Sequence, residues 1–185
     1  MSGPDRTRLL ELLRERSFAR RKVILASGRE SDFFIDCKQT VLTAEGHALV
    51  GALLFEALAK LPKVAAVAGV ELGGCPLASA VAVISFQRGA PLDAVYVRKD
   101  AKDHGSKRLL EGNATLPAGA PLAIVEDVVT TGGSTLKAAA KLREAGYVVV
   151  GVAAVVDRLE GGREAIEAEG LPLVALYTRL DFIPA

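Results

Sequence analysis

The stretch that decides the fold reads Val125-Glu126-Asp127-Val128-Val129-Thr130-Thr131-Gly132-Gly133-Ser134-Thr135. It continues the apolar run 122–125, which predicts a buried strand, and it leads into residues 134–145, which predict a helix. Glycine and small hydroxyl residues in its middle are typical of a tight connection between two such elements. The stretch therefore predicts a strand that turns directly into a helix, as in an α/β sheet.

The chain on either side continues this alternation of strands and helices. The same signals predict further strands over 64–70, 94–97, 148–156 and 173–177, and further helices over 76–86 and 163–169. Strands that alternate with helices need crossover connections, so a mainly parallel sheet flanked by helices is expected. Because such sheets bind ligands at the carboxyl ends of their strands, functional residues are expected just after the strands.

The N-terminal part has a different pattern. Asp5 is a candidate N-cap for a first helix with a stripe of leucines, and Thr43 is a candidate N-cap for a helix that runs to about Lys60. Residues 22–26 and 32–37 predict two strands of a hairpin. No linker, repeat or low-complexity segment divides the sequence, so residues 1–185 are expected to form a single domain.

Composition excludes several classes of protein. The 185 residues carry 23 lysines and arginines against 22 aspartates and glutamates, which argues against a nucleic-acid coat. The longest apolar runs, 76–86 and 147–156, are too short for a bilayer, which needs roughly 20 residues. Cys37 and Cys75 form no disulfide framework and are expected to be buried, reduced thiols. With no signal sequence at the N-terminus, a cytoplasmic protein without nucleic-acid or membrane partners is expected.

The central stretch has the residues of a site for a phosphorylated sugar. A helix N-terminus offers N–H groups and partial positive charge to a phosphate, and the glycines allow close approach. Glu126 and Asp127 would repel a phosphate, so sugar hydroxyls or a cation are their expected partners. The alternative is an ordinary junction with a capping Ser or Thr, but a cap needs one such residue rather than four. No P-loop or dinucleotide glycine pattern is present.

This stretch resembles the phosphoribosyl diphosphate (PRPP) signature of the type I phosphoribosyltransferases. The resemblance implies that Glu126 and Asp127 contact the ribose hydroxyls. It also implies that the following loop holds the 5-phosphate. The PRPP-binding residues expected on this basis are Glu126, Asp127, Val128, Val129, Thr130, Thr131, Gly132, Gly133 and Ser134.

A second segment, residues 96–108, gathers five cations and a histidine. A solvated face is the usual explanation of such a charge run. The order Arg98-Lys99-x-x-Lys102-x-His104-Gly105, however, resembles the catalytic loop of the orotate phosphoribosyltransferases. The resemblance implies that these cations bind the diphosphate of PRPP, in part across a homodimer interface. Cations placed there would stabilise the charge that develops on the leaving group. Lys102 and His104 are therefore expected to be catalytic, together with Glu126 and Asp127.

Two further segments resemble the orotate site of the same family. Residues 25–36 resemble its N-terminal hood, which implies that Phe34 and Ile35 contact the base and that Phe33 borders its pocket. Many relatives have Lys in place of Ala26. The run Asp157-Arg158-Leu159-Glu160-Gly161-Gly162 resembles its D-R-x-E-G-G motif, which implies that Arg158 pairs with the carboxylate of orotate. Thr130 completes the expected orotate-binding set. A plain hairpin and a structural Arg–Asp pair are the alternatives.

A glycine-rich segment follows the predicted strand 64–70. Gly73 and Gly74 occupy the place of the family's diphosphate loop, where their N–H groups could form an anion site. The match is loose, since many relatives have Lys in place of Gly73 and Glu71 is unexpected beside a diphosphate. A plain glycine turn before a helix is an equal alternative.

Together these motifs imply a type I phosphoribosyltransferase fold, with a hood of roughly residues 1–40 plus the C-terminal strand region. The expected activity is that of an orotate phosphoribosyltransferase in pyrimidine biosynthesis. Mg²⁺ carried on PRPP, near Glu126 and Asp127 but not bound directly by the protein, and a homodimer are implied. The alternatives are a phosphoribosyltransferase for another base and a PRPP-sensing regulator with the same fold.

Overall fold

A computed structural model describes residues 3–24, 30–99 and 109–183. Its main sheet has the strand order β5-β4-β3-β6-β7-β8, in which β5 is antiparallel to β4 and the other neighbours are parallel. The strands of this sheet are β3 (Ala66–Val70), β4 (Asp93–Val97), β5 (Leu110–Glu111), β6 (Pro121–Val129), β7 (Val148–Asp157) and β8 (Leu173–Thr178). The mainly parallel sheet confirms the predicted fold class.

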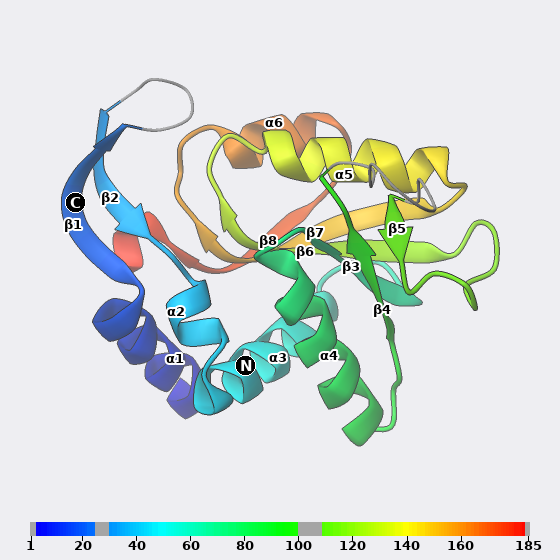
Figure 1. Cartoon of the computed structure of the whole chain (residues 1–185), viewed down its shortest axis with the longest axis horizontal. Coiled ribbons are helices and arrows are strands. Elements are labelled where there is room, and N and C mark those ends of the chain that lie inside the picture. The colour runs from blue at the N-terminus through cyan, green and yellow to red at the C-terminus, as the bar shows by residue number, and fades with distance from the viewer. Residues whose placement is uncertain (1–2, 25–29, 100–108, 184–185) are drawn as a thin grey trace, which may run out of the picture.

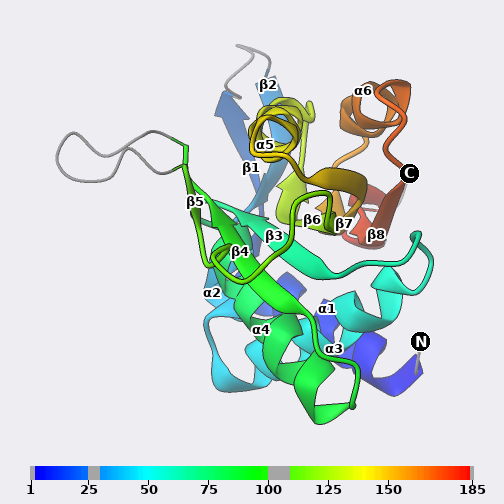
Figure 2. The same ribbon diagram turned by 90° about the vertical axis from the view of Figure 1, so that its right-hand side faces the viewer.

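Helices cover both faces of this sheet, as Figure 2 shows. α3 (Ala44–Leu58) and α4 (Gly74–Gln87) lie on one face, whereas α5 (Gly133–Glu144) and α6 (Gly162–Ala168) lie on the other. α1 (Gly3–Arg16) and the single turn α2 (Lys38–Val41) pack beside α3. Thr43 caps α3 as predicted, because its side chain accepts a hydrogen bond from the N–H of Gly46 at 3.1 Å.

Side chains of the buried strands alternate between two hydrophobic cores. In β6, Ala123 and Val125 belong to the core under α3 and α4, while Leu122 and Ile124 belong to the core under α5. This period of two is the ordinary geometry of a strand. It also fixes the direction of the polar residues that follow in the same strand.

The hairpin of β1 (Phe18–Ile24) and β2 (Glu30–Ile35) stands at one end of the sheet (Figure 1). Its inner face packs on the C-terminal segment, where the rings of Phe18, Phe33 and Phe182 lie with centroids 5.2–5.6 Å apart. Arg179 of the turn η1 (Arg179–Asp181) pairs with Asp32 at 2.5 Å. The hairpin is thereby joined to the C-terminal strand region, although the two are far apart in sequence.

Several predicted boundaries were wrong. α1 begins at Gly3, so Asp5 lies in its first turn instead of capping it. The first hairpin strand begins at Phe18, and the second ends before Cys37. β6 continues to Val129, four residues beyond the predicted end, because its polar end still pairs with the long apolar strand β7. No strand was predicted at the short β5, because two residues carry too little periodicity to be recognised.

Candidate active site

The junction of β6 and α5 lies at the carboxyl edge of the sheet. Gly132 has a left-handed backbone, with φ +78°, and a Cβ there would lie 3.0 Å from the carbonyl oxygen of Gly162. Glycine at this position therefore allows both the turn and the close approach of α6. No side chain caps α5 at Gly132. The hydroxyl groups around the junction do not serve as its cap, and the first N–H groups of α5 face the edge where a ligand could bind.

The two consecutive acids at this edge point to opposite sides of the sheet, because they follow the alternation of β6. Glu126 is on the α5 side, where its Oε1 accepts hydrogen bonds from Ser134 at 2.8 Å and Thr135 at 3.5 Å. Asp127 is on the side of α4, where its carboxylate lies against Gly73. The two carboxyl groups therefore lie on opposite sides of the strand end.

Glu126 is buried and Asp127 is partly buried. Burial raises the pKa of Glu126 to about 8, although the hydrogen bond from Ser134 lowers it, and the negative charge of Asp127 adds to the rise. Burial also raises the pKa of Asp127, against the opposing effects of the Val128 N–H and the Lys38 ammonium. Paired acids with raised pKa values at a ligand-binding edge are typical of functional sites.

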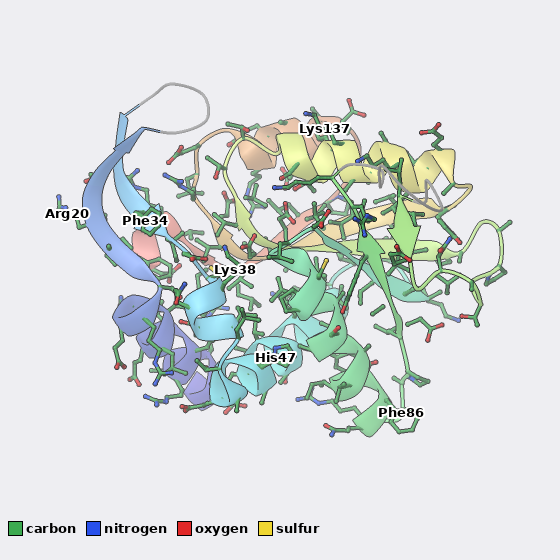
Figure 3. All side chains as sticks on the ribbon, viewed as in Figure 1. Arg20, Phe34, Lys38, His47, Phe86 and Lys137 are labelled. Carbon is green, nitrogen blue, oxygen red and sulfur yellow. The ribbon has the colours of Figure 1, made fainter. Side chains whose placement is uncertain are left out.

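The environment of Asp127 includes α2, which no motif had placed at the site. The thiol of Cys37 lies 3.8 Å from the carbonyl oxygen of Asp127, and the ammonium of Lys38 is 2.6 Å from Asp36. Cys37 and Cys75 are unpaired and buried, as predicted, and burial raises the pKa of the Cys37 thiol. Lys38, at the start of α2 (Figure 3), thus adds a positive charge that lowers the pKa of Asp127.

The glycine-rich segment after β3 lies directly against this acid. A Cβ on Gly73 would lie 2.2 Å from Oδ2 of Asp127, so any side chain there would displace the carboxylate. Gly74 begins α4, which places the N–H groups of its first turn at the same edge. The unexpected Glu71 has a structural partner, because its Oε2 accepts a hydrogen bond from the backbone N–H of Lys99 at 3.0 Å.

The described part of the predicted cationic segment, Arg98 and Lys99, lies beside the start of α5. A cavity of about 340 Å³ is lined by Arg98, Lys99, Ser134, Lys137 and Lys141, together with the apolar residues Val70, Val97 and Ala138. Lys102 and His104 lie outside the described residues. The cavity therefore joins the strand ends of β3 and β4 to the hydroxyl end of α5 with a strongly positive lining.

Arg158 follows β7 and is buried. Its Nη2 donates to the carbonyl oxygen of Phe33 at 2.9 Å and pairs with Glu160 at 2.9 Å. The guanidinium also lies 5.3 Å from the centroid of the Phe33 ring. Arg158 therefore ties the hairpin to the edge of the sheet.

The hairpin residues that were expected to contact or border the orotate base lie on two different faces of β2. Phe33 is fully buried among the core aromatics, and Ile35 packs against the same core. Phe34 points to the opposite face of the strand and is half-buried (Figure 3).

Sequence reasoning missed three lysines of this region: Lys38, Lys137 and Lys141. Each lies on a helix and matches no motif, so its place is fixed by packing alone. The i, i+4 spacing of Lys137 and Lys141 was the one available signal, since it places both on one face of α5. Within residues 3–24, 30–99 and 109–183, no group of three or more His, Cys, Asp or Glu side chains is placed to hold a metal ion. None of the described helices combines the length and the apolar character that a membrane span requires.

Comparison with known proteins agrees with this geometry. A model of the phosphoribosyl transferase domain matches residues 43–168, which run from the cap of α3 to the end of α6. The parallel sheet, the acid pair and the turn of glycine and hydroxyl residues therefore belong to a phosphoribosyltransferase, which is a transferase enzyme. The sequence is 72% identical over 180 residues to orotate phosphoribosyltransferase of Sorangium cellulosum (strain So ce56), covering 97% of this chain and 94% of that one. The chain belongs to the orotate phosphoribosyltransferase family.

Solved structures show the same relationship. The crystal structure of Mycobacterium tuberculosis H37Rv orotate phosphoribosyltransferase in complex with Fe(III) dicitrate superposes with a TM-score of 0.82 at 42% identity. It covers 97% of this chain and 99% of that chain. The same Mycobacterium enzyme in complex with PRPP gives a TM-score of 0.79 at 37% identity and covers 98% of this chain and 93% of that chain.

Proposed function

We propose that this enzyme transfers the 5-phosphoribosyl group of PRPP to orotate, giving orotidine 5′-monophosphate and diphosphate. The bond between ribose C1 and the diphosphate oxygen breaks, and its electron pair leaves with diphosphate. The bond between C1 and orotate N1 forms, and the N1 proton is released to solvent. The observation that most directly supports this proposal is the β6–α5 junction. There the acid pair Glu126 and Asp127 adjoins the start of a helix whose N–H groups suit a phosphate. The Mycobacterium relative crystallised with PRPP supports the choice of donor.

The site residues divide by the part of PRPP that each would contact. Thr130 to Ser134 would hold the 5-phosphate through backbone N–H and hydroxyl groups, with Val128 and Val129 setting the backbone that leads into the turn. Glu126 and Asp127 would accept hydrogen bonds from the ribose hydroxyls. The diphosphate would lie against the N–H groups of Gly73 and Gly74, with Arg98, Lys99, Lys102 and His104 as its cationic partners.

Lys38 would supply a further cation on the diphosphate side. Ala26 and Gly73 stand where many relatives have Lys, and the Cβ clearance at Gly73 leaves no room for a side chain beside Asp127. The Lys38 ammonium on α2 pairs with Asp36, and its charge also lowers the pKa of Asp127. We therefore assign to Lys38 the positive charge that the diphosphate loop itself lacks.

The reaction would proceed through a ribosyl centre with oxocarbenium character. Asp127, and Glu126 in its ionised form, would offset positive charge on the ribose, while the cations stabilise negative charge on the departing diphosphate. Protein groups would need only to bind and orient the two substrates and to exclude water from C1. No protein nucleophile takes part in this mechanism.

Mg²⁺ fits this site as a companion of PRPP. Glu126 and Asp127 are hard oxygen ligands, but they face a ligand from opposite sides of the sheet, and Glu126 Oε1 is already hydrogen-bonded. The ion would take its ligands mainly from PRPP and water, with the two carboxylates nearby. When bound, Mg²⁺ neutralises diphosphate charge and so favours its departure.

Orotate would bind between the hairpin and the sheet. Arg158 ties these two parts together and carries a fork of N–H donors that suits a carboxylate. Phe34 on β2 would contact the base, with Thr130 at the edge of the sheet. Ile35 would act from the core, as support for this wall of the pocket. Residues 1–40 and the C-terminal strand region would form the hood of a single domain that spans residues 1–185.

We also propose a homodimer. Large apolar side chains are exposed together around α2 and α4: Leu42 (65%), Leu72 (65%), Val83 (57%) and Phe86 (76%). An apolar groove between α3 and α4 adjoins them. An exposed apolar patch of this kind marks an interaction surface. Its proposed occupant is a second copy of the chain. Leu72 adjoins the diphosphate loop, and the family resemblance implies that the diphosphate is bound in part across a homodimer interface. The unpaired thiols of Cys37 and Cys75 support a cytoplasmic location, where cysteines stay reduced.

The decisive experiment is a spectrophotometric assay of orotate consumption with PRPP and Mg²⁺. Turnover of orotate, with none for uracil, adenine, guanine or hypoxanthine, is the expected result. Turnover of another base in place of orotate would make this a phosphoribosyltransferase of different specificity. PRPP binding without turnover of any base would favour a regulator, for which the structure gives no supporting observation.

A further inference from the structure

Every backbone polar group between the carbonyl of Val97 and the carbonyl of Lys99 is hydrogen-bonded. The Val97 carbonyl accepts from the N–H of Glu71 at 2.9 Å, and the Arg98 N–H donates to Leu109 at 2.9 Å. The Lys99 N–H donates to the side chain of Glu71 at 3.0 Å. The carbonyl oxygens of Arg98 and Lys99 both accept from the Nζ of Lys141, at 2.8 and 2.6 Å. Side chains from two other elements thus hold this short segment.

The contact with Lys141 fixes the direction of the chain. Successive carbonyls of an extended strand point to opposite sides, so two of them meet at one ammonium only where the chain bends. The chain bends at Lys99, two residues after the end of β4. Hydrogen bonds from a charged donor are stronger than neutral ones, so the ammonium holds this bend firmly. The bend in turn directs the side chains of Arg98 and Lys99 into the cationic cavity.

The arrangement brings like charges together at a cost. Arg98, Lys99, Lys137 and Lys141 all line one cavity of about 340 Å³, where their charges repel. The two carbonyl oxygens offset this repulsion for Lys141. The carboxylate of Glu71 is likewise engaged by an N–H group, which explains a negative residue beside a segment that would bind an anion.

We propose that Lys141 and Glu71 are positioning residues, which hold the bend at Arg98 and Lys99 so that both cations face the diphosphate of PRPP. This inference rests on the proposed roles of Arg98 and Lys99. Lys141 acts from α5, the helix that starts at the 5-phosphate turn, and Glu71 acts from the diphosphate loop. The two anchors therefore set the cations relative to both ends of the substrate. Misplacing a reacting or stabilising group by about 1 Å can cost on the order of a hundredfold in rate.

The test compares two lysines of the same helix face. Lys137 lies on α5 (Figure 3). It lines the same cavity, but in the described structure it donates no hydrogen bond to residues 98–99. Lys141→Met is expected to lower kcat at least tenfold with less than a threefold change in the KM for PRPP. The reason is that the leaving diphosphate gains charge in the transition state. Lys141→Arg, which keeps charged donors, is expected to recover most of kcat, and Lys137→Met, which removes a cavity charge but no hydrogen bond to residues 98–99, is expected to lower kcat clearly less than Lys141→Met.

Glu71 gives an independent arm. Glu71→Gln keeps an acceptor for the Lys99 N–H and removes only the charge, so kcat is expected to stay within twofold. Glu71→Ala removes the acceptor and is expected to lower kcat at least fivefold. This arm also carries the test if Lys141→Met does not fold.

Lys99→Met distinguishes the two levels of the argument. If Lys99→Met leaves kcat unchanged, the role proposed for Lys99 is wrong. If Lys99→Met lowers kcat but Lys141→Met does not, only the positioning inference is overturned. Equal losses in Lys137→Met and Lys141→Met would also overturn it, because cavity charge alone would then explain the effect.

Discussion

Replacing Glu126 by glutamine should change how the stability of this enzyme depends on pH. Glu126 is 4% exposed, and burial raises its pKa to about 8 from an ordinary value of 4.5. Between pH 4.5 and about pH 8, Glu126 keeps its proton in the folded state but has released it in the unfolded chain. The free energy of unfolding of the wild type therefore falls as pH rises from about 4.5 to about 8 and then levels off. At about 1.4 kcal/mol per pH unit, the interval corresponds to at most about 5 kcal/mol.

Glu126→Gln removes this contribution while keeping the shape of the protonated acid. The amide oxygen can still accept from Ser134, so the two proteins should have similar stability near pH 5. By pH 9 the variant should be the more stable one by several kcal/mol, on the order of the 5 kcal/mol ceiling. The measurement is urea unfolding of both proteins without PRPP at pH 5, 6, 7, 8 and 9.

A surface carboxylate provides the control. The hydrogen bond and charge of Arg8 lower the pKa of Glu45, so its contribution to stability is already complete above pH 6 and is lost only in acid. The difference between Glu45→Gln and wild type should therefore stay constant from pH 6 to pH 9. Parallel stability curves for Glu126→Gln and wild type over pH 5–9 would refute the reasoning, because a buried acid with a raised pKa must produce the slope.

Three further predictions concern the substrates and the assembly. Arg158→Ala should raise the KM for orotate about tenfold to a hundredfold without changing that for PRPP, the effect of losing a charged hydrogen-bonded pair of about 1.5–3 kcal/mol; an unchanged orotate KM in steady-state assays contradicts the assignment. Lys38→Met should raise the KM for PRPP several-fold while leaving that for orotate unchanged, and the exposed Lys60→Met is its control; equal PRPP constants in both variants would count against Lys38. Phe86→Asp should shift the protein toward monomer in light scattering, because each symmetric interface would lose two buried rings worth roughly 1.5–3 kcal/mol each. A variant that remains dimeric at micromolar concentration places the interface elsewhere.

The core of the candidate site could be predicted because it is contiguous in sequence. Glu126 to Ser134 forms a strand end, a turn and a helix start, so local chemistry already indicates a phosphate and a sugar. The parallel sheet followed from the same kind of local signal, since alternating apolar strands and helices allow few other arrangements. The end of β6 could not be placed in this way, because its polar residues are held in the strand by pairing with β7.

Other parts of the site depend on contacts between distant segments. Lys141 lies 42 residues from Lys99, and Lys38 on α2 acts on the pKa of Asp127 at the end of β6. Nothing in the sequence next to either lysine distinguishes it from a solvated surface residue. Glu71 was unexpected for the same reason, because its partner, the backbone N–H of Lys99, lies 28 residues away in sequence.

The sequence alone therefore determined the order of strands and helices, the phosphate turn and the acid pair, because each depends on residues that are neighbours along the chain. Only the tertiary structure decided that Glu126 faces α5 and that Asp127 faces α4 and α2. It alone also decided which lysines lie near this edge of the sheet. Those distances are set by how helices pack on the two faces of the sheet, and packing is a property of the whole buried core.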